Sequence, residues 1–181
     1  MIRLNARQLR TQVVDPEAAK KIKKNPIYII LDNVLDTYNV GAIFRLADAV
    51  AAQKVYLCGV TETPPNPRIK KASINTWKWV TWEYTASAEA AIKNLKFKIK
   101  NLKIIAVEQH EKSIMLSKLD VEFPVAVVVG NETYGISKEA LEMADVIVEL
   151  PMFGINKSLN VMVSCGIVLY KLIELLTEQN I

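Results

Sequence analysis

The stretch PVAVVVG, residues 124–130, is the most uniformly apolar and β-branched segment of the chain. Such a run is typical of a strand that is buried on both faces, as in a parallel sheet covered by helices. The run IYIIL at 27–31 has the same character. Shorter runs predict three further strands, and helical patterns lie between and after the strands; the strands are 55–60, 103–108 and 145–150, and the helices are 40–52, 87–99, 137–144 and 158–179.

This alternation of strands and helices predicts an α/β fold, with a mostly parallel sheet and helices on both of its faces. The 181 residues, about half of them apolar, suit one domain, which we place at 26–181. Residues 1–25 are basic and contain the helix-start pattern Asp15-Pro16-Glu17. This N-terminal arm is interpreted either as a solvated helix or as a segment that contacts RNA.

Several classes of site are excluded or disfavoured by composition. The chain contains neither G-x-G-x-x-G nor G-x-x-x-x-G-K-[ST], so a dinucleotide dehydrogenase or a P-loop NTPase is disfavoured. Two cysteines in apolar surroundings and a single histidine predict no metal site and no disulfide. The net charge of +4 is compatible with a polyanionic partner. We expect no membrane span and no signal peptide, and therefore a cytoplasmic protein.

Ligands of parallel α/β sheets bind at the carboxyl ends of the strands, so the segments that follow the strands deserve most weight. Three of them have unusual sequences: NVGAIFR at 39–45, GNETYGIS at 130–137, and LPMFGINKSLN at 150–160. Each combines glycine, which permits tight turns, with polar side chains at a strand-to-helix transition. For the third segment, a helix that begins at Ser158, with this serine as its N-cap, is the plain structural interpretation.

Arg45 is the most unusual residue of the first segment. On a helix it shares a face with Gly41, Ala42, Asp48 and Ala49. This stripe of small residues would let another backbone, a second subunit or a ligand approach closely. Taken alone, however, the spacing favours a surface ion pair between Arg45 and Asp48, worth under about 1 kcal/mol.

In this order, the three segments resemble the motifs of the SpoU (TrmH) type of SPOUT RNA methyltransferases, class IV enzymes that depend on S-adenosylmethionine. The first family motif, N-x-G-x-x-x-R, is matched by Asn39, Gly41 and Arg45. The second, G-N-E-x-x-G-[IL]-S, is matched by residues 130–137, and the third, [IL]-P-M-x-G-x-x-x-S-L-N-V, by residues 150–161. The resemblance covers the chain from about residue 26 and does not include the basic arm.

The resemblance implies methyl transfer from S-adenosylmethionine to a ribose 2′-hydroxyl of tRNA or rRNA by a homodimer. It also implies a Rossmann-like α/β knot, in which the chain is threaded through itself near residues 130–160. Knots are very rare, and the residue pattern alone would not have suggested one. The implied cofactor-binding residues are Gly130, Leu150, Leu159, Met152, Ser158, Val107 and Glu108.

The implied catalytic residues are Arg45, Asn39, Glu132, Ser158 and Asn160. An arginine is effectively always protonated, so we favour Arg45 as a phosphate clamp and a stabiliser of alkoxide charge rather than as a base. The alternatives are a non-catalytic RNA-binding or ribosome-assembly protein on the same fold, and an unrelated flavodoxin-like nucleotide-binding domain.

The predicted RNA contacts are basic residues outside the motifs, together with the catalytic arginine: Arg10, Arg45, Lys70 and Lys71. The lysines precede a tryptophan-rich stretch that contains Trp77, Trp79 and Trp82. These rings have two possible roles, base stacking and core packing at a dimer interface, and such packing is the expectation for at least two of them.

Overall fold

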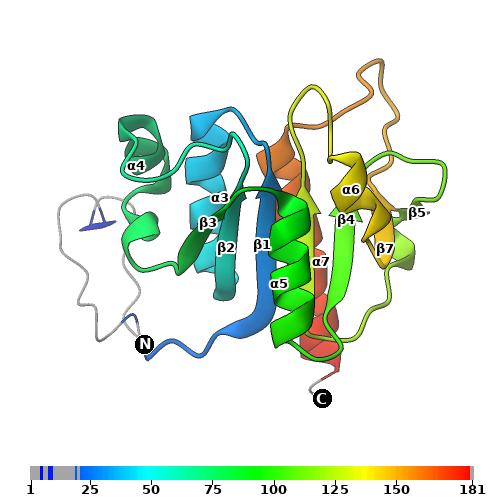
Figure 1. Cartoon of the computed structure of the whole chain (residues 1–181), viewed down its shortest axis with the longest axis horizontal. Coiled ribbons are helices and arrows are strands. Elements are labelled where there is room, and N and C mark those ends of the chain that lie inside the picture. The colour runs from blue at the N-terminus through cyan, green and yellow to red at the C-terminus, as the bar shows by residue number, and fades with distance from the viewer. Residues whose placement is uncertain (1–4, 6–7, 10–18, 20, 180–181) are drawn as a thin grey trace.

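A computed structural model describes residues 5, 8–9, 19 and 21–179 of the chain. Almost all of the basic arm, including the helix start at 15–17 and Arg10, therefore lies outside the described residues. The elements follow in the order β1 (Asn25–Asp32), α3 (Thr37–Ala49), β2 (Ala52–Cys58), α4 (Pro67–Ser73), η1 (Thr76–Lys78), β3 (Trp82–Thr85), α5 (Ala88–Lys98), β4 (Lys103–Val107), β5 (Ile114–Met115), η2 (Leu116–Lys118), β6 (Val125–Val129), α6 (Lys138–Glu142), β7 (Val146–Glu149) and α7 (Val161–Glu178) (Figure 1).

The strands form one parallel sheet in the order β3-β2-β1-β6-β4-β7-β5. Every residue of β6 is buried, as the run of valines predicts. The register pairs Leu31 with Val129 and Val107 with Val148. Neighbouring strands therefore end nearly level, and the segments that leave β1, β6, β4 and β7 start side by side at one edge of the sheet.

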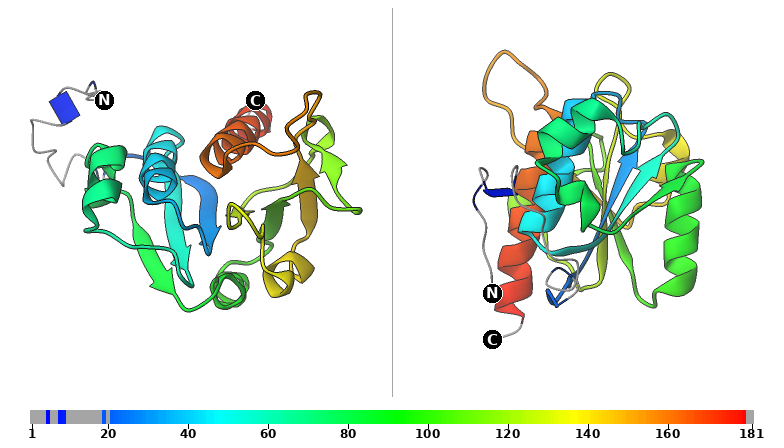
Figure 2. Two further views of the ribbon diagram at one scale, coloured as in Figure 1. Left: turned by 90° about the horizontal axis from the view of Figure 1, so that it is seen from above. Right: turned by 90° about the vertical axis from the view of Figure 1, so that its left-hand side faces the viewer.

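Helices cover both faces of the sheet, as predicted. Seen from above, α3, α4 and α7 lie on one side, and α5 and α6 lie on the other (Figure 2). The first side buries Ile43 and Phe44 of α3 with Val168 and Leu169 of α7 against the sheet. The second side buries Ile92 and Leu95 of α5 against the remaining buried strand residues, which alternate along each strand with those that face α3 and α7. The alternation of the two sets explains why the runs at 27–31, 104–107 and 125–129 are apolar throughout.

Gly41 explains how closely α3 and α4 pack. A Cβ atom at this position would lie 2.6 Å from Ala72 Cβ and 2.8 Å from the backbone oxygen of Ile69, both on α4. The expectation that another backbone can approach the small residues beside Arg45 is therefore confirmed at Gly41, and α4 leaves no room there for a ligand or a second subunit. Glycine is required here for contact within the chain.

The structure differs from the sequence-based prediction at four other places. Strands β3 and β5 were not predicted, and α4 begins inside the stretch TPPNPR at 63–68, whose composition predicts a loop. Helix α7 begins at Val161, with Asn160 as its N-cap, so the predicted start at Ser158 is wrong. The side chain of Asn160 accepts hydrogen bonds from the N–H groups of Met162 and Val163, which satisfies donors that a helix start leaves unpaired.

The expectation that both cysteines are small core residues is confirmed. Cys58 and Cys165 are buried, and burial raises the pKa of each thiol to about 12. The three tryptophans pack against the core of this chain, and Trp82 meets Phe44 edge to face at 6.4 Å between ring centroids; their place at a dimer interface stays a prediction. No helix among the described residues is long and apolar enough to cross a membrane. The threading of the chain through itself stays a prediction.

Candidate active site

A pocket of about 480 Å³ lies where β4, β6 and β7 end. Its walls come from the strand ends and from the segments that follow them: Val107, Glu108, Gln109, Val129, Gly130, Asn131, Glu132, Thr133, Gly135, Val148, Glu149, Leu150, Met152, Asn156, Ser158, Leu159, Asn160, Val161 and Ser164. This is the edge at which parallel α/β sheets bind ligands. Its size suits an organic cofactor.

Every residue predicted to bind the cofactor lines this pocket. Val107, Leu150, Met152 and Leu159 supply apolar surface, while Glu108, Ser158 and the backbone of Gly130 supply polar groups. Such a mixture fits S-adenosylmethionine, which combines an aromatic base with a polar ribose and a charged amino-acid part. The N–H of Ser158 donates to Asn156 Oδ1 at 3.2 Å, so Ser158 belongs to the pocket loop rather than to the α7 cap.

The carboxylate of Glu132 connects the second motif to the first. Its Oε2 accepts from the N–H of Leu35 at 3.0 Å. Its Oε1 accepts from the N–H of Asp36 at 3.1 Å and from Asn39 Nδ2 at 3.0 Å. Asp36 is the N-cap of α3, so Glu132 fixes the position at which that helix starts.

Asn39 extends the connection to the third motif. Its Oδ1 accepts from Asn160 Nδ2 at 3.0 Å, while Asn160 Oδ1 caps α7. Asn39 is only 5% exposed, so the loss of either hydrogen bond would leave a nearly buried polar atom unpaired. Three of the predicted catalytic residues, Asn39, Glu132 and Asn160, thus form one hydrogen-bonded chain, which we call the Asn39–Glu132–Asn160 network.

The pKa of Glu132 reflects these contacts. Partial burial acts to raise it, but the hydrogen bonds from Leu35, Asn39 and Asp36 outweigh burial and hold the pKa below the ordinary glutamate value. Glu132 is therefore ionised at neutral pH and acts as an acceptor of hydrogen bonds.

Glu108 and the two glycines of the second motif shape the adjacent wall. Glu108 Oε2 accepts from the N–H of Ile136 at 2.9 Å. Gly135 has φ +71°, and a Cβ there would lie 2.3 Å from Glu108 Oε2. A Cβ on Gly130 would lie 2.2 Å from the carbonyl carbon of Gly135. Both glycines are thus required for the loop to fold back on itself.

Asp32 and Asn33, which lie outside the three motifs and were not predicted, help to hold the second motif in place. Asp32, 1% exposed, accepts from the N–H of Ser137 at 2.7 Å, and Asn131 Nδ2 donates to the backbone oxygen of Asn33 at 2.9 Å. The signal was present in the sequence, because an Asp-Asn pair directly follows the buried run at 27–31.

Arg45 lies on α3, is exposed and does not line the pocket. Asp48 Oδ1 accepts from Trp79 Nε1 at 2.7 Å. Within the part of the chain that the structure describes, Arg45 has neither a hydrogen bond nor an ion pair, so the ion pair with Asp48 that the spacing alone favours is not formed.

Lys70 and Lys71 are exposed on α4. The opposite side of this helix, which includes Ile69 and Ser73, is buried. Since α4 packs directly on α3 at Gly41, the helices that carry these lysines and Arg45 lie on the same side of the sheet (Figure 2).

Comparison with known proteins gives matches along most of the chain. The SpoU rRNA Methylase family matches residues 26–170. A tRNA (guanosine(18)-2′-O)-methyltransferase of Aquifex aeolicus is 35% identical over 161 residues, covering 86% of this chain and 72% of that protein. The crystal structure of an A. aeolicus TrmH/SpoU tRNA modifying enzyme has a TM-score of 0.76 at 31% identity, covering 97% of this chain and 84% of that one. An AdoMet-bound rRNA methyltransferase from Sinorhizobium meliloti has a TM-score of 0.74 at 26% identity, covering 90% and 58%.

The contacts of Glu132 predict a pH-dependent effect on stability. The pKa of Glu132 is lower in the folded protein than in the unfolded chain, so the ionised carboxylate stabilises the fold. This stabilisation is fully present above the ordinary glutamate pKa of about 4.3 and is lost as the pH falls through the pKa of Glu132 in the folded protein. We expect Glu132→Gln to unfold more easily than the wild type at pH 7, with the difference shrinking as the pH falls below about 4. Denaturant titrations across this range measure the effect.

The matched control is Glu111→Gln, which alters an exposed glutamate in the loop after β4. It should show no such pH-dependent difference. A difference between wild type and Glu132→Gln that stays constant from neutral to acid pH would contradict the role given to the carboxylate.

Proposed function

This chain belongs to the SpoU rRNA methylase family and is an RNA 2′-O-ribose methyltransferase, and from that premise we propose that it methylates tRNA with S-adenosylmethionine as the donor. The observation that supports this most is the pocket itself. It collects all seven predicted cofactor residues at the carboxyl edge of the sheet and adjoins the Asn39–Glu132–Asn160 network. We place the methyltransferase domain at 26–181.

S-adenosylmethionine supplies a methyl group on a positively charged sulfur, which is already a strong donor. The residues of the chain therefore have mainly to align this group with the ribose hydroxyl. Gly130, Leu150 and Leu159, helped by Met152, Ser158, Val107 and Glu108, hold the cofactor. Asn39, Glu132 and Asn160 fix the start of α3 and the start of α7 on either side of it.

Arg45 binds RNA phosphate and stabilises the negative charge that develops on the ribose oxygen. Its exposure and its lack of a partner among the described residues support this role. Lys70 and Lys71 extend the positive charge along α4 and contact phosphates further along the RNA. Arg10 of the basic arm, which lies outside the described residues, is proposed as a further contact.

The tRNA substrate is favoured because the curated relative quoted above acts on guanosine 18 of tRNA. The direct test incubates the protein with labelled S-adenosylmethionine and unmodified tRNA transcripts that contain this guanosine, and then maps ribose methylation. We expect one 2′-O-methylated position. Methylation of rRNA alone would overturn the choice of tRNA. Absence of S-adenosylmethionine binding in calorimetry, with and without RNA, would overturn the function.

Replacement of Arg45 tests its catalytic role. We expect Arg45→Ala to lower kcat by about 10²- to 10³-fold, because it removes a charged donor to the developing oxyanion. The affinity for S-adenosylmethionine should not change, since Arg45 does not line the pocket. Arg45→Lys should retain part of the activity, because it keeps the charge without the planar fork. Full methylation by Arg45→Ala would contradict the assignment.

The exposed face of α7 supports a homodimer. Val163, Ile167 and Tyr170 are 39%, 41% and 57% exposed, and their spacing places them on one face of the helix. Such an apolar row is typical of a surface that a partner covers, and we propose that the partner is a second copy of this chain.

Ile167→Glu should convert the dimer to a monomer in light-scattering measurements, because it places a charge in the proposed interface. The matched control is Phe97→Glu, which alters an exposed apolar residue on α5, on the other face of the sheet, and should remain dimeric. A wild-type protein that is monomeric at all concentrations would contradict the proposal.

A further inference from the structure

Tyr134 lies in the second motif and has no role in the function derived so far. Its side chain is 87% exposed. The residues on both sides of it, Thr133 and Gly135, line the pocket, whereas Tyr134 itself does not. An aromatic side chain thus lies in solvent at the rim of the pocket.

The loop that bears Tyr134 is held tightly by its own hydrogen bonds. Asn131 Oδ1 accepts from the N–H groups of Thr133 at 2.8 Å and of Tyr134 at 3.0 Å. The backbones of Asn131 and Gly135 exchange two further hydrogen bonds of 2.9 Å. Because Glu132 also ties this loop to the start of α3, the Tyr134 backbone is fixed relative to the pocket.

The third motif provides a useful contrast. Phe153 and Ile155 are as exposed as Tyr134, at 95% and 103%. However, a Cβ on Gly154 between them would have no atom within 4 Å, and residues 152–155 make no hydrogen bond within the described part of the chain. A ring on a fixed loop binds a flat partner with a smaller loss of conformational entropy than a ring on an unsupported one.

We propose that the Tyr134 ring stacks on an unpaired base of the RNA segment that enters the pocket, and so positions the ribose to be methylated. Every nucleobase has a π face, and stacking on an aromatic side chain requires no particular base. A tyrosine suits this role because its large ring has few rotatable bonds. The inference rests on the proposed function and adds to it a substrate-positioning residue.

The test compares Tyr134→Ala and Tyr134→Phe with the wild type in steady-state methylation of the unmodified tRNA transcript. Stacking on one base contributes enough that Tyr134→Ala should raise the KM for tRNA roughly 5- to 150-fold. At saturating tRNA its kcat should stay at the wild-type value, and its affinity for S-adenosylmethionine should not change. Tyr134→Phe should retain the wild-type KM, because it keeps the ring.

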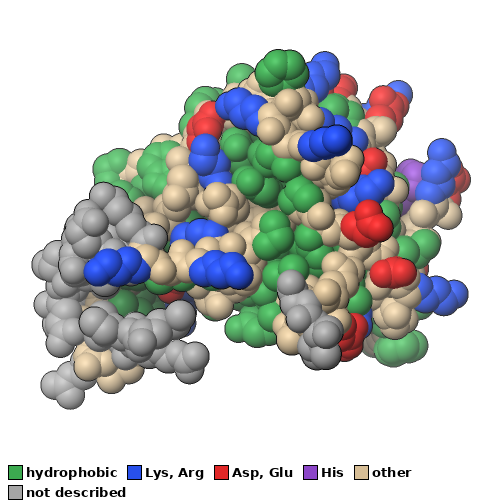
Figure 3. Space-filling model, turned by 90° about the horizontal axis from the view of Figure 1, so that it is seen from below, with side chains coloured by type: hydrophobic (Ala, Val, Ile, Leu, Met, Phe, Trp, Pro, Cys, Tyr) green, Lys and Arg blue, Asp and Glu red, His purple; other side chains and the backbone are tan. Residues whose placement is uncertain are grey.

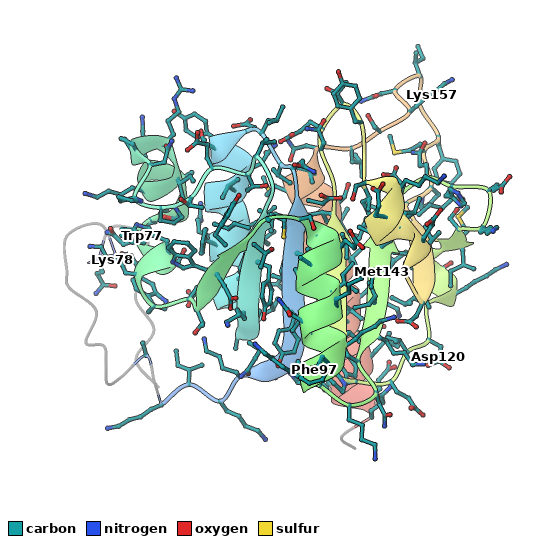
Figure 4. The ribbon with its side chains drawn as sticks, in the orientation of Figure 1. Trp77, Lys78, Phe97, Asp120, Met143 and Lys157 are labelled. Atoms are coloured by element: carbon teal, nitrogen blue, oxygen red, sulfur yellow. The ribbon has the colours of Figure 1, made fainter. Side chains whose placement is uncertain are left out.

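The matched control is Phe97→Ala. Phe97 is 91% exposed and lies at the lower end of α5, whereas Lys157 of the third motif lies at the upper end of the molecule beside the pocket loops (Figure 4). On that lower face, basic and acidic side chains are both scattered among hydrophobic ones (Figure 3). Phe97→Ala should therefore leave both KM and kcat unchanged.

Three results would overturn the inference: a wild-type KM for Tyr134→Ala, an equal loss in Tyr134→Phe, or a change of oligomeric state in Tyr134→Ala. The last would mean that a second copy covers the ring. These outcomes differ from a failure of the proposed function, in which the wild-type protein itself would neither bind S-adenosylmethionine nor methylate RNA.

Discussion

The carboxylate of Glu132 joins segments that are almost a hundred residues apart in the sequence. It accepts hydrogen bonds from the loop after β1 and from Asn39 on α3, and Asn39 in turn accepts from Asn160 at the start of α7. No one of the three motifs can keep its position without the others, because each supplies the partner of a polar group in another. This dependence explains why the motifs are individually unremarkable and specific only as a set.

The sheet makes this meeting possible. Parallel strands that end nearly level bring four chain segments to one edge. The register of β1 with β6 pairs Leu31 with Val129, so that the segments which begin with Asp32 and with Gly130 start side by side. Asp32 and Asn33 accept hydrogen bonds from the second motif. These bonds fix the loop of the second motif to the segment after β1, in addition to the hydrogen bonds that Glu132 accepts. Gly130 and Gly135 are the positions where a side chain would prevent this closeness.

Much of the fold could be predicted because its central strands are buried on both faces and therefore contain long apolar runs. Strand β3, at the edge of the sheet, and β5, of two residues, give no such signal. Helix α4 was missed although Asn66 and Pro67 form a good helix start, since the prolines before them favoured a loop.

The site was predictable to a similar extent. The motifs supplied the pocket residues, but the bond between Asp48 and Trp79 joins residues 31 positions apart and cannot be inferred from helical spacing. The same limit applies to the Asn39–Glu132–Asn160 network, whose members the motifs name without showing which atoms meet.

The distribution of charge around the pocket bears on the fate of the hydroxyl proton. Arginine stays protonated in proteins, so Arg45 cannot accept it. Glu132 is a poor acceptor as well, because its oxygens already accept three hydrogen bonds and its pKa is lowered. The amides of Asn39 and Asn160 have no basic character. We infer that the proton leaves to RNA phosphate or to water while the bond to the methyl group forms, and that the residues of this site act by placement and by charge.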